Sequence, residues 1–238
     1  MDNNNNNTNN AKALILVDIQ YDFMEGGSLQ VPNASDILEP INKLLENNNQ
    51  LFDLVVLSQD WHPQNHISFA SNHPGAQCFE TIDIQQPPPP PPRSTTTTTT
   101  IGKKDITMKQ IMWPNHCVQH SKGSEFHQHL LRSSNIKEVI IRKGMNVNVD
   151  SYSAFQDNDD QYKTELHSTL VQHHVKDIYV CGLATDYCVG YTCLDGKQLG
   201  YNVYLLSDCT RGVSDDSTNE MLSKLENNGV LLIKSTDL

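Results

Sequence analysis

The stretch DIYVCGLATDYCVGYT, residues 177–192, decides the fold because an apolar run passes there directly into a helix-length segment. Residues 177–182 have the short apolar pattern of a buried strand, and Cys188 follows where that strand should turn into a helix. A strand followed at once by a helix is the repeating unit of α/β proteins. Cys188 is therefore either a packing residue, the usual place of a free cysteine, or a nucleophile held at the end of a strand.

The same alternation of strand and helix continues on both sides of this stretch. Five further apolar runs are expected to be strands, at residues 13–17, 53–58, 138–142, 203–207 and 230–234. Amphipathic segments between them predict helices at residues 34–46, 125–132, 162–174, 186–199 and 217–227. We therefore predict an α/β protein with three α/β/α layers around a mainly parallel, doubly wound six-stranded sheet.

Polar low-complexity segments interrupt this pattern. The Asn-rich residues 1–10 and the Pro/Thr-rich block within residues 77–107 have almost no apolar side chains to bury. A length of 238 residues suits one domain with additions. We expect residues 1–10 to be a disordered tail, and residues 11–238 to be a single hydrolase-type domain with a disordered insertion at about 77–107.

Charge and hydropathy narrow the class of partner. The formal net charge of −11 opposes binding to nucleic acid or to an anionic membrane, so we expect a small-molecule partner. No apolar run approaches the length of a membrane span, and the N-terminal residues lack the pattern of a signal peptide. We expect the protein in the cytoplasm, with the nucleus as a second compartment, its six cysteines as thiols, and a homo-oligomer left open.

Chemically active side chains follow the ends of the expected strands. Ligands of such sheets bind beyond the carboxyl ends of the strands. The residues there are Asp18, Asp60 with His62, Lys143, Cys188 and Asp208. A cysteine in the first turn of a helix beside a lysine should have a pKa below its ordinary value of about 8.5. Asp18 is the candidate general base, and a helix cap or hydrogen-bond acceptor is its alternative role.

Two histidine-containing motifs indicate a metal site. DWHPQNH, residues 60–66, and MWPNHC, residues 112–117, supply the candidate ligands Asp60, His62 and His116. Mixed nitrogen and oxygen donors suit borderline divalent metals, and three protein ligands leave room for water or substrate. The alternative ligands, which we rank lower, are His66, His120, His127 and His129. His173 and His174 are expected on the surface of a helix.

These motifs together resemble those of a known family. The matching segments are LVDIQYDFMEGGSL at residues 16–29, SQDWHPQNHISFA at 58–70, MWPNHCVQHSKGSEFH at 112–127, IRKGMNVNVDSYSAF at 141–155 and VCGLATDYCVGYT at 180–192. Their order and content resemble the isochorismatase-like cysteine hydrolases, and the pair DWHP and WPNHC resembles the metal-dependent nicotinamidases within them.

The resemblance implies a site and an activity. It implies a catalytic triad of Asp18, Lys143 and Cys188, and a divalent ion, Zn²⁺ in first place, on Asp60, His62 and His116. It also implies substrate contacts and an oxyanion hole: the contacts are Phe23, Trp113, Tyr152 and Ala184, and the hole is formed by the amides of Ala184 and Cys188 after a cis peptide.

The implied reaction is the hydrolysis of nicotinamide to nicotinate and ammonia through a cysteine thioester, with a role in NAD salvage. A related cysteine amidase acting on another heteroaromatic or small amide is the alternative within enzymes. A non-catalytic family member that binds a metabolite is the alternative outside them. That reading predicts loss of Asp18, Lys143 or Cys188, and all three are present.

Overall fold

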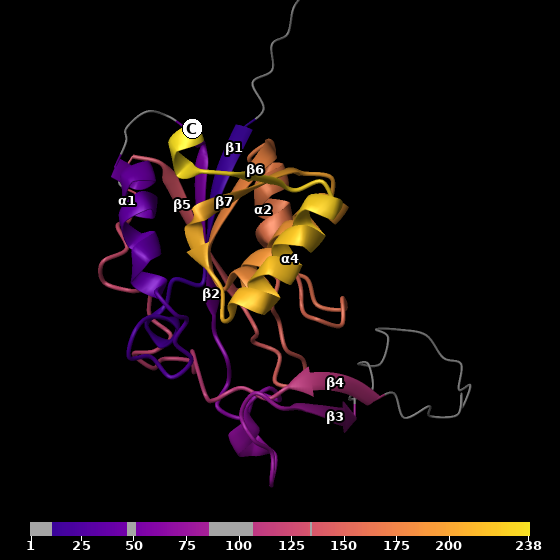
Figure 1. Ribbon diagram of the computed structural model, residues 1–238. Helices are drawn as coiled ribbons and strands as arrows, with labels where there is room; N and C mark the ends of the chain where they lie inside the picture. The colour runs from indigo at the N-terminus through magenta and orange to yellow at the C-terminus, as the bar shows by residue number, and fades with distance from the viewer. Residues whose placement is uncertain (1–10, 47–50, 86–106, 134) are drawn as a thin grey trace, which may run out of the picture.

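A parallel six-stranded sheet forms the centre of the computed structural model, which describes residues 11–46, 51–85, 107–133 and 135–238. The strand order is β5-β2-β1-β6-β7-β8, and every neighbouring pair is parallel. The strands are β1 (Ala11–Val17), β2 (Leu54–Asp60), β5 (Lys137–Lys143), β6 (Val175–Leu183), β7 (Asn202–Arg211) and β8 (Leu231–Ile233). The predicted fold class is confirmed (Figure 1).

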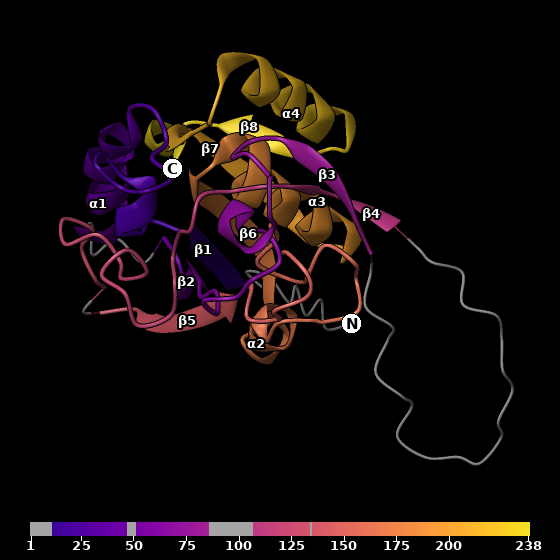
Figure 2. The same ribbon diagram turned by 90° about the horizontal axis from the view of Figure 1, so that it is seen from below.

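Helices cover both faces of this sheet. Helix α1 (Leu38–Glu46) packs on one face, and α2 (Leu166–Gln172), α3 (Gly190–Gln198) and α4 (Asp215–Asn227) pack on the other (Figures 1 and 2). Strand β1 shows why. Ile15 belongs to the apolar core beneath α2–α4, its neighbours Leu14 and Leu16 belong to the core beneath α1, and all three are at most 1% exposed. A strand that is apolar on both faces requires a layer of helices on each side.

The strand order places a crevice between β1 and β6. The chain adds β2 and then β5 on one side of β1, and it adds β6, β7 and β8 on the other side. At such a reversal of strand order, the loops after the two central strands diverge and leave room for a ligand at their carboxyl ends. Asp18 directly follows β1. Cys188 lies in the π-helical turn Thr185–Val189, which follows β6 and continues into α3.

The disordered insertion expected at about residues 77–107 is wrong for residues 81–85, which form an ordered strand. Strands β3 (Thr81–Gln85) and β4 (Thr107–Ile111) form an antiparallel ribbon in which Thr81 pairs with Ile111. Alternating burial along the strands explains why the ribbon is ordered, because Ile84 and Gln110 are buried while their neighbours along each strand are more exposed. The ribbon lies at the carboxyl end of the parallel sheet (Figure 2). Residues 86–106 and the expected tail at residues 1–10 lie outside the described residues.

The helix expected at residues 125–132 is also wrong, because this segment follows turns instead. Its backbone bonds to another part of the chain: the His127 amide donates to the Ile19 carbonyl, and the Tyr21 amide donates to the Glu125 carbonyl. These long-range bonds take the place of bonds within a helix.

None of the helices in the described part of the chain has the length and apolar character to cross a membrane.

Candidate active site

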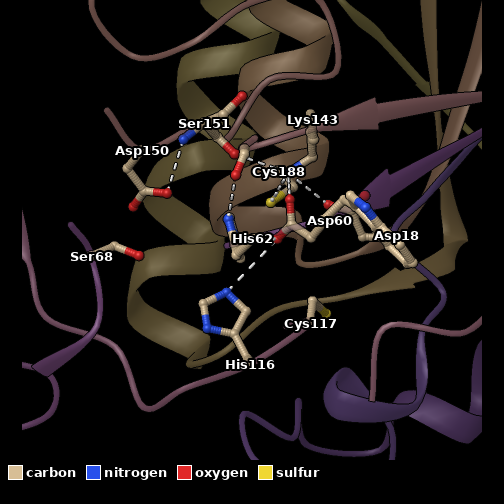
Figure 3. Close-up of polar contacts among 12 residues, drawn as sticks. Asp18, Asp60, His62, Ser68, His116, Cys117, Lys143, Asp150, Ser151 and Cys188 are labelled. Carbon is tan, nitrogen blue, oxygen red and sulfur yellow. Dashed lines mark hydrogen bonds and ion pairs between the residues drawn. The ribbon is translucent and has the colours of Figure 1, made fainter. Parts of the chain in front are cut away.

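Four neighbouring strands each deliver one reactive side chain to the same end of the sheet. Lys143 is the last residue of β5, Asp60 is the last residue of β2, Asp18 follows β1, and Cys188 follows β6. Because these strands are adjacent in the order β5-β2-β1-β6, the four side chains meet (Figure 3). None of them is more than 8% exposed. The structure thus brings together the three residues predicted as a triad.

Lys143 is the centre of this cluster. Its Nζ lies 3.0 Å from Asp18 Oδ2, donates to Asp60 Oδ1 and to the Ser151 carbonyl at 2.9 Å, and lies 3.3 Å from Cys188 Sγ. Burial works against the charge of Lys143, but the two carboxylates hold its pKa well above the ordinary value. The ammonium group is therefore retained beside the sulfur.

The thiol of Cys188 does not have the lowered pKa that was predicted from a place in the first turn of a helix beside a lysine. Burial raises its pKa well above the ordinary value, and the charge of Lys143 only opposes this effect. Burial also raises the pKa of Asp18, against the charge of Lys143 and a hydrogen bond of 2.7 Å from Ser58 Oγ. A protonated thiol needs a base before it can attack. Asp18 is placed for this, with a carboxylate oxygen within 4.8 Å of the sulfur.

Asp60, His62 and His116 form a group of ligand atoms within 4.8 Å of one another. Asp60 Oδ2 lies 3.4 Å from His62 Nε2 and 3.8 Å from His116 Nε2. Each histidine has its Nδ1 near a peptide carbonyl, that of Gly144 at 2.8 Å and that of Pro114 at 2.9 Å. A carbonyl can only accept, so each Nδ1 carries a hydrogen, and the Nε2 of a neutral imidazole then offers a lone pair. Burial works against a charge on His62, but the Asp60 carboxylate raises the pKa of His62 above its ordinary value, so a bound cation must displace the Nε2 proton.

The electrostatics of this group also suit a cation. Burial and the neighbouring His62 lower the pKa of His116 to about 4, so its imidazole is neutral, as a metal ligand must be. Burial alone would raise the pKa of Asp60, but Lys143 and His62 hold it below the ordinary value, so Asp60 is a carboxylate. Two imidazoles and one carboxylate are an ordinary donor set for a divalent metal ion. The three residues therefore fit such an ion.

The alternative histidines have other surroundings. His66 is buried, with Nδ1 2.8 Å from Ser68 Oγ and Nε2 3.2 Å from the Val149 carbonyl, and it forms a second group of potential ligand atoms with His62 and Asp150. Within the described residues, His120, His127 and His129 belong to no group of potential ligand atoms. They make ring contacts instead. The centre of the His127 ring lies 5.1 Å from that of His129 and 5.0 Å from that of Tyr21, and the His120 ring lies 5.1 Å from that of Trp61.

One pocket, with about 420 Å³ of empty space including its open mouth, connects the cysteine to the metal-ligand group. Cys188, Asp60 and His116 line it, together with the predicted substrate contacts Phe23, Trp113, Tyr152 and Ala184. The sequence did not indicate four further apolar wall residues: Leu29, Val31, Tyr187 and Val213. Two of them carried a signal, because Leu29 and Tyr187 lie in segments that resemble the family. The peptide between Leu183 and Ala184 is cis, as expected.

Asp208 is not part of this pocket, although it was expected at a strand end. Strand β7 continues to Arg211, and the pairing of β6 with β7 shifts register between Val180 and Gly182. The Asp208 carboxylate instead accepts hydrogen bonds from the Ser235 amide at 2.8 Å and from the Ser235 hydroxyl at 2.6 Å. It holds the C-terminal turn of the chain.

The chain matches characterised proteins along nearly its whole length. Residues 12–237 match the isochorismatase domain. A nicotinamidase from Escherichia coli is 42% identical over 203 residues, which span 85% of this chain and 84% of the relative. A nicotinamidase from Acinetobacter baylyi is 36% identical over 227 residues, which span 95% of this chain and 94% of the relative.

Solved structures give the same picture. A nicotinamidase/pyrazinamidase of Acinetobacter baumanii superposes with a TM-score of 0.82 at 37% identity, over 97% of this chain and 99% of that chain. Yeast nicotinamidase bound to the inhibitor nicotinaldehyde gives 0.81 at 32% identity, over 94% and 99%. Pyrazinamidase of Pyrococcus horikoshii in complex with zinc gives 0.70 at 30% identity, over 94% and 98%.

Proposed function

The chain belongs to the isochorismatase family, and we propose that it is a nicotinamidase, an amidohydrolase that converts nicotinamide to nicotinate and ammonia. One observation carries the proposal: Cys188, two residues of the metal-ligand group and several aromatic rings line the same pocket. A planar aromatic ring can pack between the side chains of Trp113 and Phe23 while its carboxamide faces the sulfur.

The first half of the reaction forms a thioester. Asp18 takes the proton of the Cys188 thiol, and Sγ attacks the carboxamide carbon. Lys143, with Nζ 3.3 Å from Sγ, stabilises the negative charge on the sulfur as it develops. The backbone amides of Ala184 and Cys188 donate to the oxyanion. Asp18 then passes its proton to the nitrogen, and the C–N bond breaks to release ammonia.

The second half regenerates the enzyme. Asp18 takes a proton from a water molecule, whose oxygen attacks the thioester carbon. The C–S bond breaks, the proton returns to the sulfur, and nicotinate leaves. The raised pKa of Asp18 suits both of its tasks, because a carboxylate that is too weakly basic would not accept the thiol proton.

Asp60, His62 and His116 would hold the divalent ion, and zinc is the ion that we propose, supported by the zinc complex of the Pyrococcus horikoshii pyrazinamidase. When bound, the ion supplies a Lewis acid for the pyridine nitrogen of the substrate. Asp60 ends β2, His62 lies two residues beyond it, and His116 lies in the segment after β4. The three residues can therefore orient the ring while the triad attacks the carboxamide.

The test is an ammonia-release assay on nicotinamide beside a panel of heteroaromatic and aliphatic amides. We expect nicotinamide to be the preferred substrate and Cys188→Ala to lose turnover. The role that follows from this activity is NAD salvage in the cytoplasm. Cys193→Ala is the matched control, because Cys193 is buried in the core and does not line the pocket. Preference for another amide would indicate a related cysteine amidase, and the absence of turnover on every amide would indicate a non-catalytic binding protein.

A further inference from the structure

The carboxylate of Asp186 has no role in the mechanism above, although it lies within the turn that carries the nucleophile. Asp186 is 5% exposed. No cation in the described part of the chain forms an ion pair with it. A buried carboxylate without a cation is costly unless hydrogen bonds satisfy its oxygens. Its hydrogen-bond partners therefore show what it holds.

Those partners all belong to the connection between β7 and α4 or to the first turn of α4. The Val213 amide donates to both oxygens, at 3.0 and 3.1 Å, and the Ser214 amide donates to Oδ2 at 3.4 Å. Ser217 Oγ donates to Oδ2 at 2.5 Å. The first turn of α4 lies here, with Ser214 as its N-cap, so the helix dipole also favours the negative charge. Asp186 thus joins the nucleophile turn to the N-terminus of α4.

A second bond and the close packing support this connection. The Thr185 hydroxyl lies 2.7 Å from the Thr210 hydroxyl at the end of β7. A Cβ on Gly212 would lie 1.8 Å from Thr218 Oγ1 and 3.2 Å from Asp186 Oδ1, so the chain passes closely over the carboxylate. The turn is therefore held from the side of α4.

The connection ends at the pocket. Val213, whose amide makes two of the bonds to Asp186, lines the same pocket as Ala184 and Cys188, and Asp186 lies midway in sequence between those two residues. We propose that Asp186 is a positioning residue that fixes the spacing between the nucleophile turn and the Val213 wall of the pocket. Without it, the turn can shift against the bound substrate, and a displacement of about 1 Å can cost on the order of 100-fold in rate.

The test compares Asp186→Ala with Asp208→Ala. Asp208 is a matched control, because it is a partly buried carboxylate that accepts an amide and a serine hydroxyl from another segment, away from the pocket. We expect Asp186→Ala to lower kcat at least about tenfold, with KM changed less than about threefold and bound metal unchanged. Asp208→Ala should keep kcat within about twofold, and Asp186→Asn, which still accepts from the Val213 amide, should keep it within about threefold.

The role rests on the proposed function, so the rate at which iodoacetamide alkylates Cys188 serves as a second readout that needs no substrate. Asp186→Ala should slow alkylation more than threefold, because the sulfur leaves its place beside Lys143. Absence of nicotinamide turnover in the wild-type protein would refute the function and leave this readout intact. The positioning role is refuted if alkylation is unchanged, if Asp208→Ala loses as much activity, or if Asp186→Asn is as slow as Asp186→Ala. Should Asp186→Ala not fold, Ser217→Ala must slow alkylation more than twofold, and an unchanged rate refutes the role.

Discussion

Removing the hydroxyl group of Ser58 should change the pH dependence of the reaction without touching the substrate. Ser58 Oγ donates a 2.7 Å hydrogen bond to Asp18 Oδ1, and both side chains are 0% exposed. Burial raises the pKa of Asp18, and this hydrogen bond acts in the opposite direction. Ser58→Ala deletes the bond and leaves a gap of a single oxygen atom. The pKa of Asp18 should therefore rise.

The size of the effect follows from the strength of the bond in each protonation state. A hydrogen bond to a charged group contributes about 1.5–3 kcal/mol, and one to a neutral group contributes about 0.5–1.5 kcal/mol. The ionised form of Asp18 therefore loses about 1–1.5 kcal/mol more than the protonated form. Since 1.36 kcal/mol corresponds to one pKa unit, the acidic limb of the kcat/KM profile should move upward by about one pH unit.

Ser58→Ala should also lower the free energy of unfolding, by an amount that depends on pH. The variant raises the pKa of Asp18 in the folded state and leaves it unchanged in the unfolded state. Protonation of Asp18 then stabilises the folded variant more than the folded wild-type protein. The difference in unfolding free energy between the two proteins is therefore largest at pH values above the folded-state pKa, where Asp18 is ionised. The loss narrows as the pH falls through that value. Urea titrations at several pH values measure it.

The assay is the pH profile of kcat/KM for ammonia release, with Ser124→Ala as the control. Ser124 is also 0% exposed, but its hydroxyl donates to the neutral Ser121 carbonyl at 2.8 Å. This variant should lose about 1 kcal/mol of stability and keep the wild-type profile. An acidic limb that stays in place in Ser58→Ala, despite a loss of stability, would refute Asp18 as the base.

Three further changes probe other parts of the site. Gly144→Ala places a Cβ 2.3 Å from His62 Cε1 and should weaken metal binding more than about tenfold in a chelator competition. Gly75→Ala is the control, because Gly75 also has a positive φ but faces open space, and it should leave metal binding unchanged. Trp113→Ala removes an aromatic wall of the pocket and should raise KM at least about tenfold in initial-rate measurements; an unchanged KM would place the ring elsewhere. Lys143→Met leaves two buried carboxylates without their cation and should cost about 3–5 kcal/mol in urea titrations, and a loss below about 1 kcal/mol would contradict the buried ion pairs.

Prediction from sequence succeeded where the signal is local or follows a general rule of the fold. Apolar runs of strand length identified all six strands of the parallel sheet, because burial on both faces demands continuous apolar residues. The helix predicted at residues 125–132 is wrong because contacts distant in sequence decide the structure of this segment. Its helical pattern was overridden by backbone bonds to residues 19–21, which lie far away in sequence.

The prediction of disorder failed in a similar way for residues 81–85. Residues 81–85 contain only two apolar side chains, too few to indicate an ordered strand when taken alone. Pairing with residues 107–111 supplies the missing hydrogen bonds, and burial of Ile84 and Gln110 completes the ribbon. Strand pairing across an intervening segment is a property of the folded chain, not of either strand.

The sequence by itself determined which chemical groups stand at the carboxyl ends of the strands, because strand ends and residue types can be read along the chain. It thereby predicted that Asp18, Asp60, Lys143 and Cys188 would share one crevice. Only the tertiary structure decided their protonation. Burial raises the pKa of the Cys188 thiol against the charge of Lys143, where a place in the first turn of a helix beside a lysine had predicted a lower value. Desolvation depends on every segment that covers a group, and those segments come from distant parts of the chain, so the pKa of a buried side chain is a tertiary property.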